Sequence, residues 1–118
     1  MKIRIKGNSL RYRLTKSDMY RLSQEGYLED KTDFGNRELI YVIQKTTKNE
    51  LSAFFNDNVI CLQIPAKMIG ELENTDRVGF EGNEGKLYLL VEKDFTCLDN
   101  VSEDQSDNYP NPLAEKLK

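Results

Sequence analysis

Apolar and polar residues alternate along the first fourteen positions of this chain. Charged or small polar residues separate the apolar ones, which are Ile3, Ile5, Leu10, Tyr12 and Leu14. Alternation with a period of two is typical of strands with one buried and one exposed face. The pattern therefore predicts two adjacent strands joined by a tight turn.

The apolar spacing then changes to three or four residues, which indicates helices. The first helix is expected to begin at Thr15 or Ser17 and to end near Gly26, and the second to begin at Pro65 and end before Asp76. Two further strands are predicted after each helix: Tyr27–Phe34 and Glu38–Lys45 in the first half, and Arg77–Glu81 and Lys86–Val91 in the second.

The two halves of the chain match without a gap when the sequence is shifted by fifty residues. Matched apolar pairs include Leu10 with Ile60, Tyr12 with Leu62, Leu22 with Leu72, and Leu28 with Val78; the last strand fits best with a shift of 48. Coincidence between two strand-rich halves is the alternative. We expect an α+β, mainly β fold in which two ββαββ repeats, residues 1–46 and 51–92, form one domain over residues 1–92.

The chain becomes strongly acidic after the second repeat. Residues 92–109 carry six acidic residues against one basic residue. We expect residues 93–118 to form an acidic C-terminal extension that is partly flexible, because it has few apolar residues.

Charge is distributed very unevenly along the chain. Residues 1–21 have a formal charge of +6 and residues 22–118 one of −9. The N-terminal cations alternate with apolar residues, so the two first strands would place like charges side by side, which is unfavourable without a nearby anion. That anion is a nucleic-acid phosphate, an acidic partner, or a carboxylate of the chain itself, such as Glu29, Asp30, Asp33 or an acidic residue of the extension.

Several classes of site have no support in the composition. Of 118 residues none is histidine, and Cys61 and Cys97 are the only cysteines, so we expect no metal, no cofactor and no enzymatic activity. Cys61 stands between two apolar residues on a predicted strand, which favours burial.

The first twenty residues hold no apolar core of signal-peptide length, and the longest apolar run covers residues 39–43. We therefore expect a cytoplasmic protein without a membrane span.

Two segments resemble a known family. The stretch "GNSLRYRL" and the stretch "NDNVICLQIPAKMIGELENTDRVGFEGNEGKLYLLV" are similar to two successive copies of the AbrB/MazE swapped-hairpin motif. This resemblance covers residues 2–92 and implies that the two repeats exchange hairpins to form one barrel with pseudo-twofold symmetry. The chain is then expected to be a monomer or a homodimer. The whole chain is also similar to a family of small bacterial proteins to which no function is attached.

In the AbrB/MazE family, the first hairpin and its turn lie against DNA. The resemblance implies the same role for Lys6, Asn8, Ser9 and Arg13, with Arg4 and Arg11 as neighbours. The second half departs from this pattern, because the positions of the first-half cations are taken by Ser52, Phe54, Asn56 and Gln63. One chain would therefore present one basic half, and a symmetric DNA-binding surface would require two chains.

The resemblance also suggests a role for the extension. In MazE-type antitoxins an acidic C-terminal segment wraps a toxin, and Phe95, Leu98 and Tyr109 could act as equivalent anchors for a protein partner. The alternative is that the extension folds over the basic hairpin of its own chain. The sequence thus predicts a binding protein, with double-stranded DNA as the first candidate ligand and a protein partner as the second.

Overall fold

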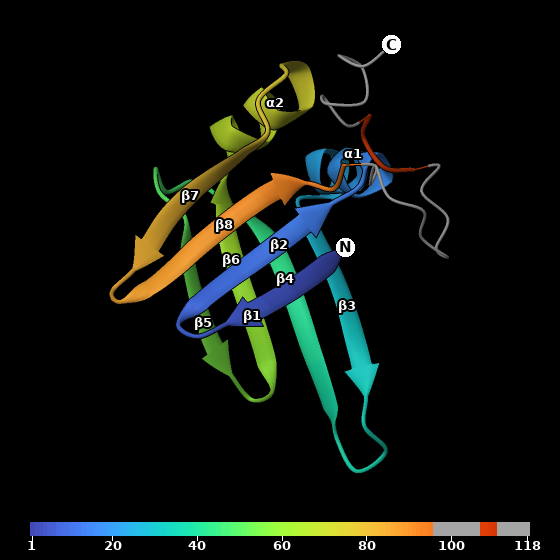
Figure 1. The fold of residues 1–118 in the computed structure, drawn as a ribbon, viewed down its shortest axis with the longest axis vertical. Coiled ribbons are helices and arrows are strands. Elements are labelled where there is room, and N and C mark those ends of the chain that lie inside the picture. The colour runs from blue at the N-terminus through green and yellow to red at the C-terminus, as the bar shows by residue number, and fades with distance from the viewer. Residues whose placement is uncertain (96–106, 111–118) are drawn as a thin grey trace.

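A computed structural model describes residues 1–95 and 107–110. Within these residues, eight strands and two helices follow one another along the chain (Figure 1): β1 (Lys2–Lys6), β2 (Ser9–Leu14), α1 (Lys16–Glu25), β3 (Tyr27–Asp33), β4 (Glu38–Thr46), β5 (Ser52–Asn56), β6 (Val59–Pro65), α2 (Ala66–Asn74), β7 (Gly79–Glu84) and β8 (Leu87–Lys93). The fold is α+β and mainly β, as predicted.

The strands form two four-stranded sheets. Sheet A has the order β1-β2-β8-β7 and sheet B the order β3-β4-β6-β5. Each sheet therefore combines one hairpin from the first half of the chain with one from the second half. The two hairpins of a sheet meet through a parallel pair, β2 with β8 and β4 with β6, whereas each hairpin is antiparallel.

The two sheets have the same internal register across the central parallel pair. Tyr12 lies opposite Val91 in sheet A, and Leu62 lies opposite Ile43 in sheet B. These positions are related by the shifts of 50 and 48 residues that the sequence indicates. The hairpins from the two halves therefore occupy equivalent places in the two sheets.

One predicted strand was placed too early. Leu28 lies opposite Ile43, and Phe80 lies opposite Val91, so the residue equivalent to Leu28 is Phe80 rather than Val78. The strand begins at Gly79 because the preceding residues form the turn that leaves α2. In this turn the Thr75 hydroxyl oxygen accepts a hydrogen bond from the Arg77 amide at 3.1 Å.

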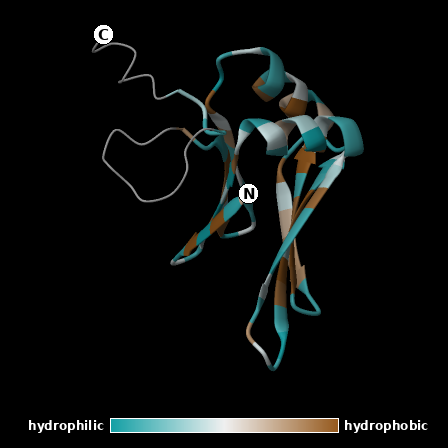
Figure 2. Ribbon diagram, turned by 90° about the vertical axis from the view of Figure 1, so that its right-hand side faces the viewer, coloured by the Kyte–Doolittle hydropathy of each residue, from teal (hydrophilic) through white to brown (hydrophobic). Residues whose placement is uncertain are grey.

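The sheets do not close into the barrel that the family resemblance implies. Among the described residues, β1, β3, β5 and β7 each pair with one neighbour and so remain edge strands. Strands β5 and β7 come close to each other without pairing, and the buried side chain of Leu51, which directly precedes β5, packs against Gly82 of β7. Figure 2 shows that the two sheets pack together near the helices and diverge toward their opposite ends.

The hydrophobic core lies between the sheets at the helix end. It consists of inward-facing strand residues and the apolar faces of both helices; its buried members are Leu10, Tyr12, Leu14, Met19, Leu22, Leu28, Ile43, Leu51, Ala53, Leu62, Ile64, Ile69, Leu72, Leu89 and Val91. Side chains of alternate strand residues point to one face, so each strand contributes a row of residues to this core. The same alternation places the intervening residues on the outer faces of the sheets.

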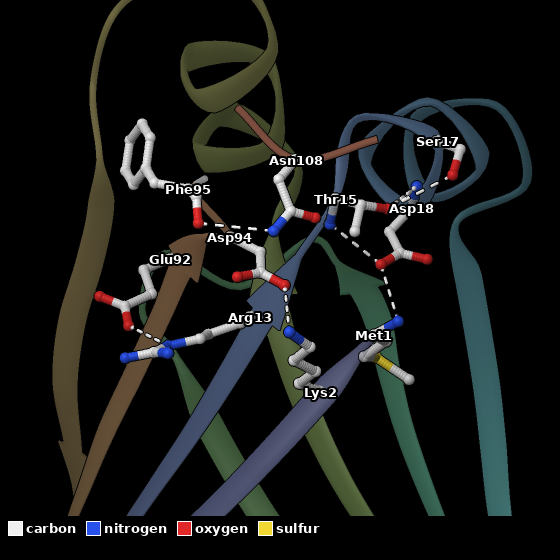
Figure 3. Close-up of polar contacts among 10 residues, drawn as sticks. All are labelled: Met1, Lys2, Arg13, Thr15, Ser17, Asp18, Glu92, Asp94, Phe95 and Asn108. Atoms are coloured by element: carbon white, nitrogen blue, oxygen red, sulfur yellow. Dashed lines mark hydrogen bonds and ion pairs between the residues drawn. The ribbon is translucent and has the colours of Figure 1, made fainter. Parts of the chain in front are cut away.

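Both helices begin and end close to the predicted residues. Thr15 caps α1: its hydroxyl accepts from the Asp18 amide, and the Asp18 carboxylate accepts from the Thr15 amide at 3.0 Å (Figure 3). Asp18 Oδ2 also lies 2.8 Å from the amino group of Met1. Gly26 ends α1 in the left-handed conformation, and Pro65 precedes the first residue of α2. Neither helix in the described part of the chain is long and apolar enough to cross a membrane.

Candidate nucleic-acid interface

Five cationic side chains share the outer face of sheet A. They alternate with inward-facing apolar residues on β1 and β2, and we call them the basic face: Lys2, Arg4, Lys6, Arg11 and Arg13. The antiparallel register places Arg4 directly opposite Arg11 and Lys2 directly opposite Arg13. Directly opposed like charges destabilise a sheet unless anions neutralise them. The expected juxtaposition of cations therefore exists in the fold.

Acidic residues of the same chain neutralise part of the basic face. Glu92 on β8 lies beside β2, and its Oε1 atom is 2.8 Å from Arg13 Nε and 3.6 Å from Arg11 Nε. Lys2 Nζ lies 3.2 Å from Oδ2 of the buried Asp94, although this contact lacks hydrogen-bond geometry. Figure 3 shows the pairs of Arg13 with Glu92 and of Lys2 with Asp94. Because both arginines are partly exposed, their ion pairs contribute little to stability.

Glu92 and Asp94 are not among the acidic residues that the sequence suggests from the first half of the chain. Those are Glu29, Asp30 and Asp33. Glu29 accepts a hydrogen bond from the Tyr27 hydroxyl at 2.6 Å, and both residues lie in sheet B. This contact raises the pKa of Tyr27 to about 12. The carboxylates of β3 therefore do not neutralise the basic face, because β3 and β1 belong to different sheets.

Arg4 and Lys6 are exposed and form no ion pair within residues 1–95 and 107–110. Together with Arg11 they line a shallow depression of about 120 Å³ on the outer face of sheet A. Tyr88 and Leu90 form its other wall, and the Tyr88 hydroxyl is held by the carboxylate of Glu81. Three cations thus surround an open hollow that has the size of a small anionic group.

The turn residues that the resemblance assigns to DNA contacts form hydrogen bonds within the chain. Asn8 Nδ2 donates to the Lys86 carbonyl at 2.7 Å, and Ser9 Oγ donates to the Lys6 carbonyl at 2.6 Å. The Asn8 carbonyl also accepts from the Tyr88 amide at 3.0 Å. The Asn8 side chain therefore attaches the β1–β2 turn to the β7–β8 hairpin, and the Ser9 side chain closes the turn within its own hairpin.

The outer face of sheet B has no equivalent set of cations. At the places that correspond to Arg4 and Arg11, sheet B has Phe54 and Cys61, which lie directly opposite each other. Cys61 is buried, as expected, and burial raises the pKa of its thiol. In the described part of the chain, no group of three or more histidine, cysteine or acidic residues is arranged to hold a metal ion.

A family of unknown function, DUF7009, matches residues 1–113. The chain belongs to this family. Comparison with curated proteins and with solved structures gave no match. The DUF7009 match covers both sheets, both helices and the described segment at residues 107–110.

This C-terminal segment of the DUF7009 chain packs against the end of β8. Tyr109 forms a parallel β-bridge with Phe95, the ring centroids are 5.9 Å apart, and the Tyr109 amide donates to the Asp94 carbonyl at 2.9 Å. Asn108 Nδ2 contacts the Phe95 carbonyl at 3.4 Å (Figure 3). Two of the predicted partner anchors therefore contact each other within the chain, and the third, Leu98, lies outside the described residues.

The same segment also binds the beginning of α1. The Ser17 hydroxyl donates to the Asp107 carboxylate, and the Lys16 amide donates to the Asp107 carbonyl at 3.2 Å. The hydrogen bond from Ser17 lowers the pKa of Asp107, and a carboxylate at a helix N-terminus is favoured by the helix dipole. The described part of the extension thus contacts α1 and β8 rather than Arg4 or Lys6.

We predict that Asp107→Asn loosens the docked segment. The variant loses a charge-assisted contact at α1, so the Lys16 and Tyr109 amides should exchange faster with deuterium than in the native chain. Because folding lowers the pKa of Asp107, the docked state is favoured at pH values above the ordinary value of 3.8 and weakens as pH falls through the lowered pKa. Glu84→Gln, on the β7–β8 hairpin, is the control and should leave both amides unchanged. Equal exchange in Asp107→Asn and native protein would contradict the prediction.

Proposed function

We propose that this protein binds double-stranded DNA through the basic face. The observation that carries the proposal is the exposure of Arg4 and Lys6, which have no ion pair in the described part of the chain, beside Arg11. Phosphate oxygens between these side chains would relieve the repulsion between opposed cations. Among the described residues, Glu81 and Glu92 lie on this outer face and Asp94 pairs with Lys2, so three acidic residues against five cations leave a positive balance.

The shape of the basic face suits a duplex. Strands β1 and β2 form an antiparallel two-stranded ribbon at the edge of sheet A, and both helices lie beyond one end of the sheets (Figure 1). The major groove of B-form DNA admits a two-stranded β-ribbon. Strand β1 has no strand neighbour on its outer side among the described residues, which leaves this edge of the ribbon open to a groove.

The contacts available to DNA are mainly phosphate contacts. Asn8 and Ser9 are held by backbone carbonyls, so they are poorly placed to read base edges. Arginine and lysine at exposed positions neutralise phosphates irrespective of sequence. We therefore propose binding with little sequence discrimination and a strong dependence on salt.

We also infer that the two halves arose by duplication and exchange hairpins. The equivalent registers of Tyr12 with Val91 and of Leu62 with Ile43 support this, as does the presence of one hairpin from each half in each sheet. Under this pseudo-twofold relation the face equivalent to the basic face has Phe54 and Cys61 at its centre. DNA binding is then a property of one half of the duplicated unit.

The first experiment is a fluorescence anisotropy titration of a labelled random-sequence duplex with the full chain at several salt concentrations. We expect the slope of log affinity against log salt to lie between about −2.7 and −4.5, because each of three to five neutralised phosphates contributes about −0.9. A duplex of different sequence should bind with closely similar affinity. Absence of binding at low salt, or an affinity independent of salt, would reject the proposal.

Protein interaction through the C-terminal extension is the second candidate. Its support is the pair of aromatic side chains Phe95 and Tyr109, which lie next to each other and are both partly buried. Because Tyr109 also packs against the core, a partner that used both rings would have to displace the segment from the end of β8.

A further inference from the structure

Strands β1, β2 and β8 lie side by side in sheet A (Figure 1), and two rows of side chains cross their outer face. In each row the residue on β1 is a cation and the residue on β8 is aromatic or aliphatic. One row is Lys6, Ser9 and Tyr88, and the other is Arg4, Arg11 and Leu90. All six residues line the depression of about 120 Å³, which we call the hollow. The hollow therefore has a cationic side and an apolar side.

The ring of Tyr88 is held along this face. The residue is 37% exposed, and its hydroxyl donates to the carboxylate of Glu81 on β7. Tyr88 is paired with Asn83, whereas Glu81 is paired with Leu90, two residues further along β8. To reach Glu81 the ring must lean along the sheet toward Leu90 instead of pointing straight into solvent. A partly exposed aromatic ring is thus fixed beside the cations.

The floor between the cations and this ring is small and uncharged. Ser9 stands between Lys6 and Tyr88 in its row, and its hydroxyl donates to the Lys6 carbonyl. The hydrogen bond to Glu81 raises the pKa of Tyr88, so the phenol stays neutral and does not repel an anion. The carboxylate of Glu81 belongs to β7, on the side away from β1. An anionic group is therefore attracted toward β1, and a flat apolar group fits toward β8.

A nucleotide with an unpaired base has both of these groups. Its phosphate is an anion that arginine and lysine bind through charge-assisted hydrogen bonds. Its base has a flat face that stacks on aromatic side chains, which is how proteins commonly hold single-stranded nucleic acid. A base inside a duplex is already stacked between its neighbours, so only an unpaired base can use the ring of Tyr88.

The hollow is too small to enclose a free nucleotide. Pockets for small molecules have volumes of about 300 to 1,000 Å³ and bury most of the ligand surface. The hollow is smaller than this, and its cations Arg4 and Lys6 are exposed. Beyond the hollow the basic face continues along the ribbon to Lys2 and Arg13, which suits several phosphates in succession. A nucleotide that is part of a DNA strand is therefore the favoured occupant.

We propose that the basic face binds DNA at an unpaired nucleotide, such as one at a single-stranded end, with the phosphate in the hollow beside Arg4 and Lys6 and the base stacked on Tyr88. This inference rests on the proposed function and adds to it a preferred structure of the DNA. The cations supply the affinity for phosphate, and Tyr88 determines the preference for an unpaired base. Because every base has a flat face, stacking adds little sequence discrimination.

The test compares three labelled DNAs by fluorescence anisotropy with the full chain at one low salt concentration. The first is a blunt duplex, the second adds a short single-stranded end to the same duplex, and the third has the same end without its bases. The last two carry equal numbers of phosphates, so their difference in affinity reports contacts to bases. We expect the end with bases to bind about fivefold or more tightly than the abasic end.

Substitutions of Tyr88 assign this difference to the ring. Tyr88→Ala should bind the two single-stranded ends equally and keep its affinity for the blunt duplex. Tyr88→Trp should keep the preference, because it retains a ring that stacks. Phe54→Ala is the matched control: Phe54 is 53% exposed on the outer face of sheet B, where it lies opposite Cys61 instead of a cation. It should behave like the native protein. Circular dichroism establishes that each variant is folded.

The inference and the proposed function fail in different ways. A blunt duplex that does not bind at low salt contradicts the proposed function. If the blunt duplex binds but the native protein has equal affinity for the two single-stranded ends, the inference alone is overturned. A preference that persists in Tyr88→Ala also overturns it. So does displacement of the DNA by an equal concentration of a free nucleoside monophosphate, which would identify a small molecule as the ligand.

Discussion

Replacing Arg4 and Lys6 together with glutamate is expected to lower the affinity for duplex DNA by about 100-fold or more at low salt. These two side chains are exposed and form no ion pair among the described residues, so their full charge is available to phosphates. The salt slope should also become shallower by about 2, because two phosphate contacts are lost. Anisotropy titrations of the variant and native chains with the same duplex measure both effects.

A matched variant separates a local effect from one of net charge. Arg37→Glu with Lys48→Glu changes the net charge by the same amount, but both residues are exposed in loops away from β1. We expect this control to reduce affinity much less and to keep the native salt slope. Equal losses in the two double variants would mean that overall charge drives binding and that the basic face is not the site.

Tyr12→Ala is expected to destabilise the fold by about 3 to 5 kcal/mol, the range observed when a large buried ring is truncated. Tyr12 is fully buried on β2, and its hydroxyl donates to the Ile60 carbonyl in sheet B at 3.2 Å. Its ring meets that of Tyr41 edge to face, with centroids 6.5 Å apart. One side chain thus joins the two sheets through both packing and a hydrogen bond. Burial raises the pKa of Tyr12, so the phenol stays protonated. Urea denaturation measures the change in the free energy of unfolding.

Two further substitutions help to interpret the loss of stability in Tyr12→Ala: one isolates the hydroxyl, and the other is an exposed control. Tyr12→Phe keeps the ring and removes the hydroxyl, so a loss of about 1 kcal/mol is expected. Tyr20→Ala removes a ring that is 62% exposed on α1 and should change stability by less than about 0.5 kcal/mol. If Tyr12→Ala cost no more than Tyr20→Ala, the contact between the sheets at Tyr12 would not be a major source of stability.

Local features of the chain were predictable because they depend on neighbours in sequence. The capping of α1 by Thr15 and its end at Gly26 follow from hydrogen bonding and backbone freedom within one turn. The outward position of Arg4 and the inward position of Tyr12 follow from the period of two in a strand. The burial of Cys61 follows from its place in an apolar strand. For these features the sequence by itself was sufficient.

The pairing of distant segments was decided by the tertiary structure. Strand β2 lies beside β8, which brings Glu92 to Arg13 across 79 positions of sequence and leaves Arg4 and Lys6 without an acid in the described part of the chain. Alternation along a strand defines which residues face outward, but it does not define which strand is its neighbour. The approach of β5 to β7 is also a long-range feature, since Leu51 packs against Gly82 while the two strands stay unpaired. Which cations have no ion pair among the described residues, and which strands form the sheet edges, therefore depend on long-range packing, which no local pattern specifies.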